Sequence, residues 1–211
     1  MQKIVDNFSI IENILEFKNK DEFYYLQIIQ RKKDGNIVQN GSNGYRTIKS
    51  FYIFSKKQFL NRQEKIKELC IKNNARAYIH LNKRNAREVA LASIQQYAKL
   101  VSEGNSYQGY RVWDSACGGN RARGYKPLWV IDIDSKDPEY VKTVIELVNG
   151  CRGAEENKVR YQIPTLHGYH LITIGFDVQQ FSLKLAINNM DPIDIQKDNP
   201  TLLYYNDFSS K

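Results

Sequence analysis

The 211-residue sequence has few cysteines, and their scarcity excludes several classes of small protein. Cys70, Cys117 and Cys151 are odd in number and far apart, so the chain has neither a disulfide framework nor a Cys-x-x-Cys zinc knuckle. Cys70 falls on the apolar face of an expected helix and is predicted to lie in the core. The other two are predicted to lie in loops.

Long apolar runs are also missing. No stretch approaches the length that a membrane span requires, and Asp6, Glu12 and Glu16 interrupt what would be the hydrophobic part of a signal peptide. We therefore expect a cytoplasmic protein without a membrane partner. No Gly-Lys-Ser/Thr sequence occurs, so a Walker-type phosphate loop is excluded, and there is no internal repeat.

The composition is otherwise that of a globular protein, with 42% apolar and 26% charged residues. The net charge of +8 favours a polyanionic partner, and 14 tyrosines and nine phenylalanines provide flat surfaces on which bases can stack. The alternative is that the charge has no acidic partner and that most of these aromatic side chains are buried.

The first hundred residues mix strands and helices and are predicted to form an N-terminal αβ module, residues 1–104. Apolar spacing and turn residues predict helices at 4–17, 55–73 and 85–103 and strands at 23–30, 47–54 and 75–81. Lys83 and Arg84 precede the last helix, where free backbone N–H groups favour anions. They are candidate nucleic-acid contacts, or simply a solvated helix end.

Residues 105–127 form a connecting segment rich in glycine and arginine. Glycines permit close backbone approach, and Arg111, Arg121, Arg123 and Lys126 offer donors for phosphate. The segment resembles a phosphate-cradling loop in composition, and a basic surface linker explains it equally well.

The C-terminal part, residues 128–211, is predicted to form a second module. Its pattern gives strands at 128–134, 159–163, 169–174, 192–195 and 201–205, with helices at 138–149 and 177–187. This order is that of a split β-α-β sheet with both helices on one face and the other face open. The fold class is therefore α+β, with the modules together forming one compact unit.

Two acids end the first strand of this module. Asp132 and Asp134 are two residues apart, so a strand directs both side chains to one face. Two adjacent carboxylates repel unless a cation lies between them, and Mg²⁺ or Mn²⁺ prefers such oxygen ligands. The alternative is a strand end whose acids face water or cap the helix that begins at Pro138.

Further polar residues follow on neighbouring strands. His170 enters an apolar strand and could contact a nucleotide phosphate, although a lone histidine there is more often structural. Asp194 alternates with Ile193 and Ile195, so it points away from the buried face and could complete a carboxylate triad. Lys197 lies in the following turn as a candidate phosphate contact.

Together, Val130-Ile-Asp-Ile-Asp134, Gly168-Tyr-His170 and Ile193-Asp194 resemble the three catalytic motifs of the archaeo-eukaryotic primase (primase-polymerase) superfamily. The compact prokaryotic, plasmid and phage members are the most similar. The resemblance implies an RRM-like catalytic sheet behind an N-terminal αβ module.

The resemblance also implies roles. Asp132, Asp134 and Asp194 would hold Mg²⁺ or Mn²⁺ for nucleotidyl transfer from NTPs or dNTPs, and His170 would contact the incoming nucleotide. We expect Lys197, Arg121 and Arg123 to assist in nucleotide binding, and Arg111, Lys126, Lys83 and Arg84 to hold a single-stranded DNA or RNA template. A helicase or another replication protein is a possible partner.

Three alternatives remain open from the sequence alone. The chain is short for a complete primase, so it could be a catalytically reduced primase-fold protein that binds single-stranded nucleic acid or a replication partner. A metal-dependent nuclease could use the same three acids. A haloacid dehalogenase type of phosphatase is disfavoured, because Lys136 stands where that motif has Thr or Val.

Overall fold

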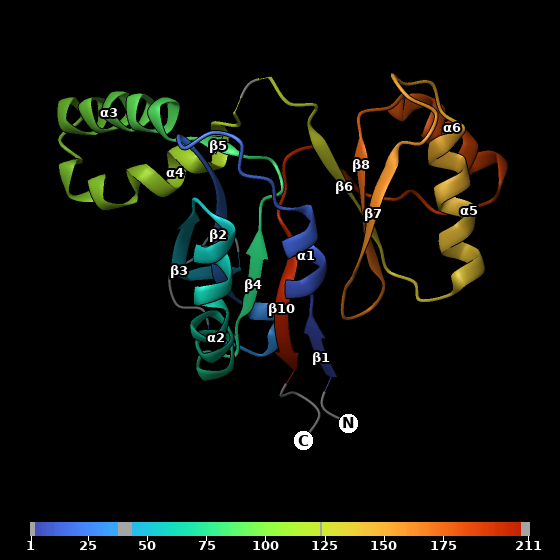
Figure 1. The fold of residues 1–211 in the computed structure, drawn as a ribbon, viewed down its shortest axis with the longest axis horizontal. Helices are drawn as coiled ribbons and strands as arrows, with labels where there is room; N and C mark the ends of the chain where they lie inside the picture. The colour runs from blue at the N-terminus through green and yellow to red at the C-terminus, as the bar shows by residue number, and fades with distance from the viewer. Residues whose placement is uncertain (1–2, 38–43, 123, 208–211) are drawn as a thin grey trace.

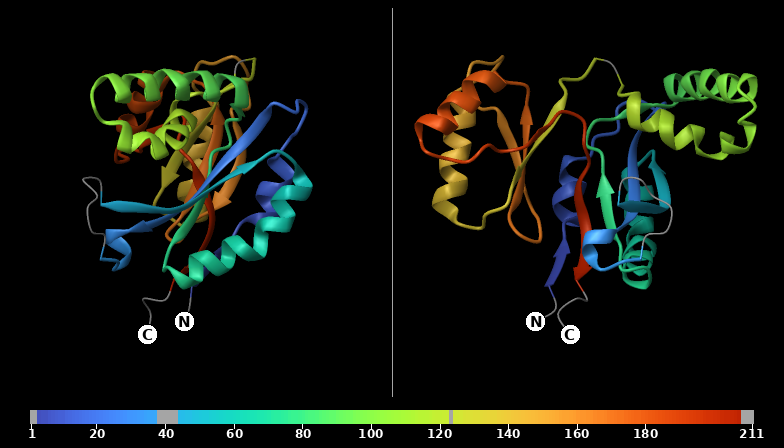
Figure 2. Two further views of the ribbon diagram at one scale, coloured as in Figure 1. Left: turned by 90° about the vertical axis from the view of Figure 1, so that its left-hand side faces the viewer. Right: turned by 180° about the vertical axis from the view of Figure 1, so that it is seen from behind.

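The computed structural model describes residues 3–37, 44–122 and 124–207, which form two antiparallel sheets and six α-helices (Figure 1). The α+β class predicted from the sequence is confirmed. The two sheets lie beside each other, and Figure 2 shows the same arrangement from the side and from behind.

The larger sheet contains strands from both ends of the chain. Its strands are β1 (Lys3–Asp6), β2 (Glu22–Arg31), β3 (Tyr45–Ile53), β4 (Arg76–Ile79), β5 (Arg84–Asn85) and β10 (Thr201–Asp207). They lie in the order β1-β10-β4-β2-β3, with β5 paired to β2. β2 and β3 pair as a hairpin around a 3-10 turn at Lys32–Asp34, with Gly35 in the left-handed conformation at its end.

Two helices pack on one face of this sheet. Helix α2 (Lys56–Lys72) matches the helix predicted at 55–73 and follows the cap residue Ser55, whose side chain accepts a hydrogen bond from the Gln58 amide. Helix α1 (Phe8–Ile14) is shorter than predicted, because residues 3–6 instead pair with β10 and satisfy their backbone groups there. The predicted core position of Cys70 is confirmed.

Three helical segments form a separate cluster above the sheet. They are α3 (Ala86–Ser102), the 3-10 helix η2 (Ser106–Arg111) and α4 (Val112–Gly119). The segment predicted as a connecting loop is thus largely helical, because Val112, Ala116 and Cys117 bury one face of α4. Cys151, also predicted in a loop, is buried just after the fifth helix.

The smaller sheet has the order β7-β8-β6-β9, and every neighbouring pair is antiparallel. Its strands are β6 (Leu128–Ile133), β7 (Val159–Pro164), β8 (Tyr169–Ile174) and β9 (Ile195–Gln196). Helices α5 (Pro138–Asn149) and α6 (Val178–Ile187) each connect two strands that flank a third one. Their apolar side chains cover the face that carries Ile131 and Ile133 (Figure 1).

The opposite face of the smaller sheet is not open, contrary to the prediction from the sequence. Val130, Ile163 and Ile172 on this face join the core of the larger sheet, together with residues of α1. The middle of this face is therefore buried, because the transfer of these apolar side chains from water into the core is favourable.

The last strand also departs from the predicted division into modules. β10 pairs with β1 and β4 of the larger sheet, so residues 201–207 leave the smaller sheet and return to the first module. Asn7 strengthens this return, since its side-chain amide donates to the carbonyls of Leu202 and Pro164, each at 2.9 Å. The two sheets are thereby joined into one body.

A buried arginine in β5, just before α3, links this strand to α4 and to the segment between β9 and β10. The Arg84 side chain is 0% exposed and donates to the Cys117 carbonyl at 2.5 Å and to the Asn82 carbonyl at 2.9 Å. Its guanidinium also lies 3.2 Å from the Asp198 carboxylate and 3.1 Å from Nδ1 of His80. Burial, with the Arg84 charge, lowers the pKa of His80 to about 3, so this imidazole is a neutral acceptor in the fold.

The core of the smaller sheet allows a direct stability test. Phe181 in α6 is 0% exposed, so Phe181→Ala should lower the free energy of unfolding by about 3–5 kcal/mol. Leu183 in the same helix is 65% exposed, and Leu183→Ala should change it by less than about 0.5 kcal/mol. Urea denaturation of both variants checks this, and similar losses in the two would contradict the assigned packing.

His80 should make the stability depend on pH. Its folded pKa of about 3 lies below the ordinary value of 6.5, so its contribution is complete above pH 6.5 and declines as the pH falls towards 3. The loss should approach about 1.4 kcal/mol per pH unit for this one group. His80→Asn, which keeps a polar atom near Nδ1 but does not titrate, should lose less between pH 7 and 4.5 in urea denaturation. Parallel curves for the two proteins would refute the buried neutral state.

Candidate acidic site on the smaller sheet

Asp132 and His170 face each other on the two central strands of the smaller sheet. They are register partners across β6 and β8, and Nε2 of His170 lies 3.4 Å from Oδ1 of Asp132. The other ring nitrogen, Nδ1, lies 2.9 Å from the hydroxyl oxygen of Thr201 at the start of β10. Thr201 is fully buried, so the larger sheet fixes the orientation of the imidazole.

Asp194 reaches the same face from the other side of β6. Ile131 pairs with Ile195, and the Asp132 amide donates to the Asp194 carbonyl at 3.2 Å, so Asp194 continues the register opposite Asp132. Opposite residues of an antiparallel pair share a face. The Asp194 carboxylate is exposed and accepts a hydrogen bond from Nε2 of Gln196 at 2.6 Å. Three residues from distant parts of the chain thus occupy one face of three adjacent strands.

Asp134 lies just beyond the end of β6 and is exposed. Within residues 3–37, 44–122 and 124–207, no three or more His, Cys, Asp and Glu side chains form a group able to hold a metal ion. The carboxylates have the right chemistry for Mg²⁺ or Mn²⁺, but Asp132 faces His170 and Asp194 accepts from Gln196. The three-acid metal site therefore stays a prediction.

Cations of the larger sheet act on this site. Contact with His170 lowers the pKa of the Asp132 carboxyl, partial burial opposes that shift, and the charges of Lys33 and Arg31 add to the lowering. Arg31 is held by a hydrogen bond from its guanidinium to the Tyr78 hydroxyl at 2.8 Å. Sequence analysis missed both cations as site residues, although the basic run Arg31-Lys-Lys33 directly follows a strand.

Gly168, in the second of the three motifs, packs against the end of β6. A Cβ atom here would lie 1.8 Å from the Ile133 carbonyl oxygen and 2.7 Å from the Ser135 amide nitrogen. Both atoms belong to the backbone and cannot move without displacing the strand that carries Asp132. This close contact explains why glycine, which has no Cβ atom, occupies position 168, two residues before His170.

The structure corrects one of the predicted nucleic-acid contacts and places a second one at the edge of the core. Arg84 is fully buried and its donors are used inside the protein, so it cannot reach a ligand at the surface. Lys83 is 8% exposed, with Nζ 3.5 Å from the Glu22 carboxylate. Neither side chain belongs to a solvated helix end, because β5 holds this segment against β2.

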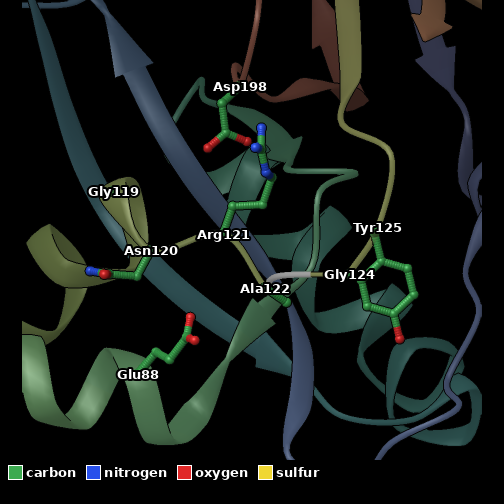
Figure 3. Close-up of a pocket in the computed structure, with 8 residues that line it drawn as sticks. All are labelled: Glu88, Gly119, Asn120, Arg121, Ala122, Gly124, Tyr125 and Asp198. Atoms are coloured by element: carbon green, nitrogen blue, oxygen red, sulfur yellow. The ribbon is translucent and has the colours of Figure 1, made fainter. Parts of the chain in front are cut away.

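The other predicted basic contacts lie apart from the acidic site. Arg121 lines a pocket of about 600 Å³ beside α3 and α4, and Figure 3 shows its guanidinium directed towards Asp198. Arg123 lies outside the described residues. Lys126 forms an ion pair with Glu155 at 2.5 Å, and the Arg111 guanidinium lies over the Tyr110 ring. The contacts of Arg121, Lys126 and Arg111 thus lie away from Asp132.

Lys197, which is predicted to bind nucleotide, extends to the side of the sheet opposite Asp132 and His170. Its Nζ lies 5.1 Å from the ring centroid of Trp129. Trp129 packs with the core under α5 and α6, whereas Asp132 points to the opposite face. Lys197 therefore makes a cation–π contact on the face of the sheet opposite the acidic site.

Comparison with known proteins gives no relative: no family model, no curated protein and no solved structure matches the chain. Across the part of the chain that the structure describes, no helix is both long and apolar enough to cross a membrane.

The close approach at Gly168 predicts a specific sensitivity. Gly168→Ala should lower the free energy of unfolding by about 1–3 kcal/mol, because its Cβ must displace backbone of residues 133–135. Gly118 in α4 has open space where a Cβ atom would lie, so Gly118→Ala should be neutral or stabilising. Urea denaturation of both variants tests this, and an unchanged midpoint for Gly168→Ala would disprove the tight contact.

Proposed function

We propose that this chain is a primase/polymerase-like nucleotidyltransferase that acts on nucleic acid with a divalent metal ion and NTPs or dNTPs. The observation that carries the proposal is that three residues from separate motifs, Asp132, His170 and Asp194, lie on one face of adjacent strands. Residues 62 positions apart in the chain have no local reason to meet in this way. A shared chemical role accounts for the convergence.

The topology of the smaller sheet supports the finer fold assignment within this proposal. Antiparallel strands in the order β7-β8-β6-β9, with α5 and α6 on one face, are what an RRM-like module requires. The larger sheet would then be the αβ module that accompanies it in the primase-polymerase superfamily. The motif-bearing face of β6 points towards that module.

Each residue of the site has a proposed task. Asp132, Asp134 and Asp194 would hold Mg²⁺ or Mn²⁺, which when bound supplies charge neutralisation for a triphosphate and orients the attacking hydroxyl. His170, fixed by Thr201, would donate to a phosphate oxygen. Arg31 and Lys33 would raise the local positive potential and so favour a polyphosphate.

The test is extension of a labelled primer on a single-stranded DNA template, with Mg²⁺ or Mn²⁺ and with NTPs or dNTPs. Asp132→Asn and Asp194→Asn should reduce incorporation by at least about 100-fold, because they remove charges that would hold the metal. Asp191→Asn is the matched control, since Asp191 is an exposed acid three residues before Asp194.

Two results would count against the proposal. Incorporation at the control rate in both Asp132→Asn and Asp194→Asn would remove these acids from the chemistry. Shortening of the labelled strand without extension, lost in the same two variants, would instead identify a metal-dependent nuclease.

A second candidate function is binding of single-stranded nucleic acid, or of a replication partner, without catalysis. The pairing of Asp132 with His170, and the lack of a preformed three-acid group among the described residues, favour it. Binding would then be independent of metal and sensitive to salt, because phosphate contacts release counterions. Tight binding in EDTA, with no extension or cleavage under any metal, would support this function.

A further inference from the structure

A second pocket lies between α1 and the start of β6, away from the acidic site. Its volume is about 260 Å³. Ile14 and Leu81, both nearly buried, contribute apolar surface to it. Tyr125 and Tyr161 also line the pocket, and their side chains are 39% and 40% exposed. The pocket thus combines an apolar lining with aromatic rings that are accessible from outside.

The charged side chains of this pocket are mostly basic. Lys83, Arg121, Lys126 and Arg160 line it together with one acid, Glu16. Neighbouring carboxylates neutralise part of this charge, since Glu155 pairs with both Lys126 and Arg160. Glu16 in turn pairs with Lys18 at 2.8 Å. The pocket therefore retains a basic lining even after its ion pairs are counted.

Lys83 is the feature that points to a ligand. Its side chain is 7% exposed, and its ammonium has no hydrogen-bond partner within the described structure. Glu22 lies 3.5 Å away and already accepts a hydrogen bond from the Tyr125 hydroxyl at 2.7 Å. The ammonium also lies 4.3 Å from the centroid of the Tyr125 ring, so its charge is partly compensated while its hydrogen-bonding capacity is unused. An anion that reaches it from the pocket would supply the missing hydrogen bond.

We propose that this pocket binds one nucleotide unit of a single-stranded nucleic acid. The phosphate would lie against Lys83 and Arg160, and the base would stack on Tyr161, because a basic pocket with exposed aromatic rings matches both halves of a nucleotide. The choice of a nucleic-acid strand over a free nucleotide rests on the proposed function. The inference that the ligand combines an anionic group with an aromatic ring rests on the pocket itself.

Binding of a fluorescein-labelled ten-residue oligothymidylate, followed by anisotropy in EDTA, tests the proposal. Lys83→Met and Arg160→Gln should each weaken binding and reduce the slope of log affinity against log salt by about 0.7, as expected for one lost phosphate contact. Tyr161→Leu should weaken binding by about 5- to 150-fold through loss of stacking. Lys142→Met in α5 and Tyr110→Leu in η2 remove exposed side chains elsewhere and should leave it unchanged.

The outcomes separate this inference from the proposed function. Unchanged affinity in Arg160→Gln and Tyr161→Leu, with unaltered melting temperatures, would overturn the pocket even if primer extension persists. Thymidine monophosphate that competes as well as the oligomer would overturn the strand assignment. Binding that is lost in the pocket variants but kept in Asp132→Asn would support the pocket, whether or not the acids prove catalytic.

Discussion

The buried ion pair between Arg84 and Asp198 is the constraint on which the arrangement of the two sheets depends. The Arg84 guanidinium also donates to the Cys117 carbonyl in the last turn of α4 and contacts the neutral ring of His80, so three segments of the chain meet at one side chain. A buried charge is tolerated when its donors are satisfied, and removing one partner of such a pair typically costs about 3–5 kcal/mol. The pair therefore fixes where the segment after β9 can lie.

This constraint reaches the acidic site through two short connections. β9 has two residues and its pairing with β6 is correspondingly limited. Asp198 and Thr201, which both follow β9, help to hold this segment in place through their contacts with Arg84 and His170. Asn82 secures the beginning of β6, because its side-chain amide both donates to the Leu128 carbonyl and accepts from the Leu128 amide. The register within the smaller sheet sets the common face of Asp132, His170 and Asp194, and the bonds to the rest of the protein hold the segments that carry them in place.

Local structure could be predicted from the sequence where the deciding interactions are local. α2 and α5 begin within one residue of the predicted starts at 55 and 138, directly after Ser55 and Asp137, because each of these side chains caps the helix that follows it. The sheet that receives β10 could not be predicted, since alternation of apolar residues indicates a strand but not its neighbours. Nor could the burial of Arg84, whose partners lie up to 114 residues away. The face shared by Asp132 and Asp194 follows from the sequence pattern, but their companions Arg31 and Lys33 come from a different sheet.

One face of β6 connects the two sites while keeping them apart. Leu128 lines the basic pocket, Val130 is buried in the shared core, and Asp132 lies in the acidic site, all on alternate positions of the same strand. Four residues of extended chain separate the two ends by roughly 13 Å. At this separation, which exceeds the Debye length of about 8 Å at physiological ionic strength, mobile ions screen most of the interaction between the solvent-exposed charges of the two ends. A ligand at the basic pocket can therefore be lost without disturbing the acids, and the two sites can be assigned independently.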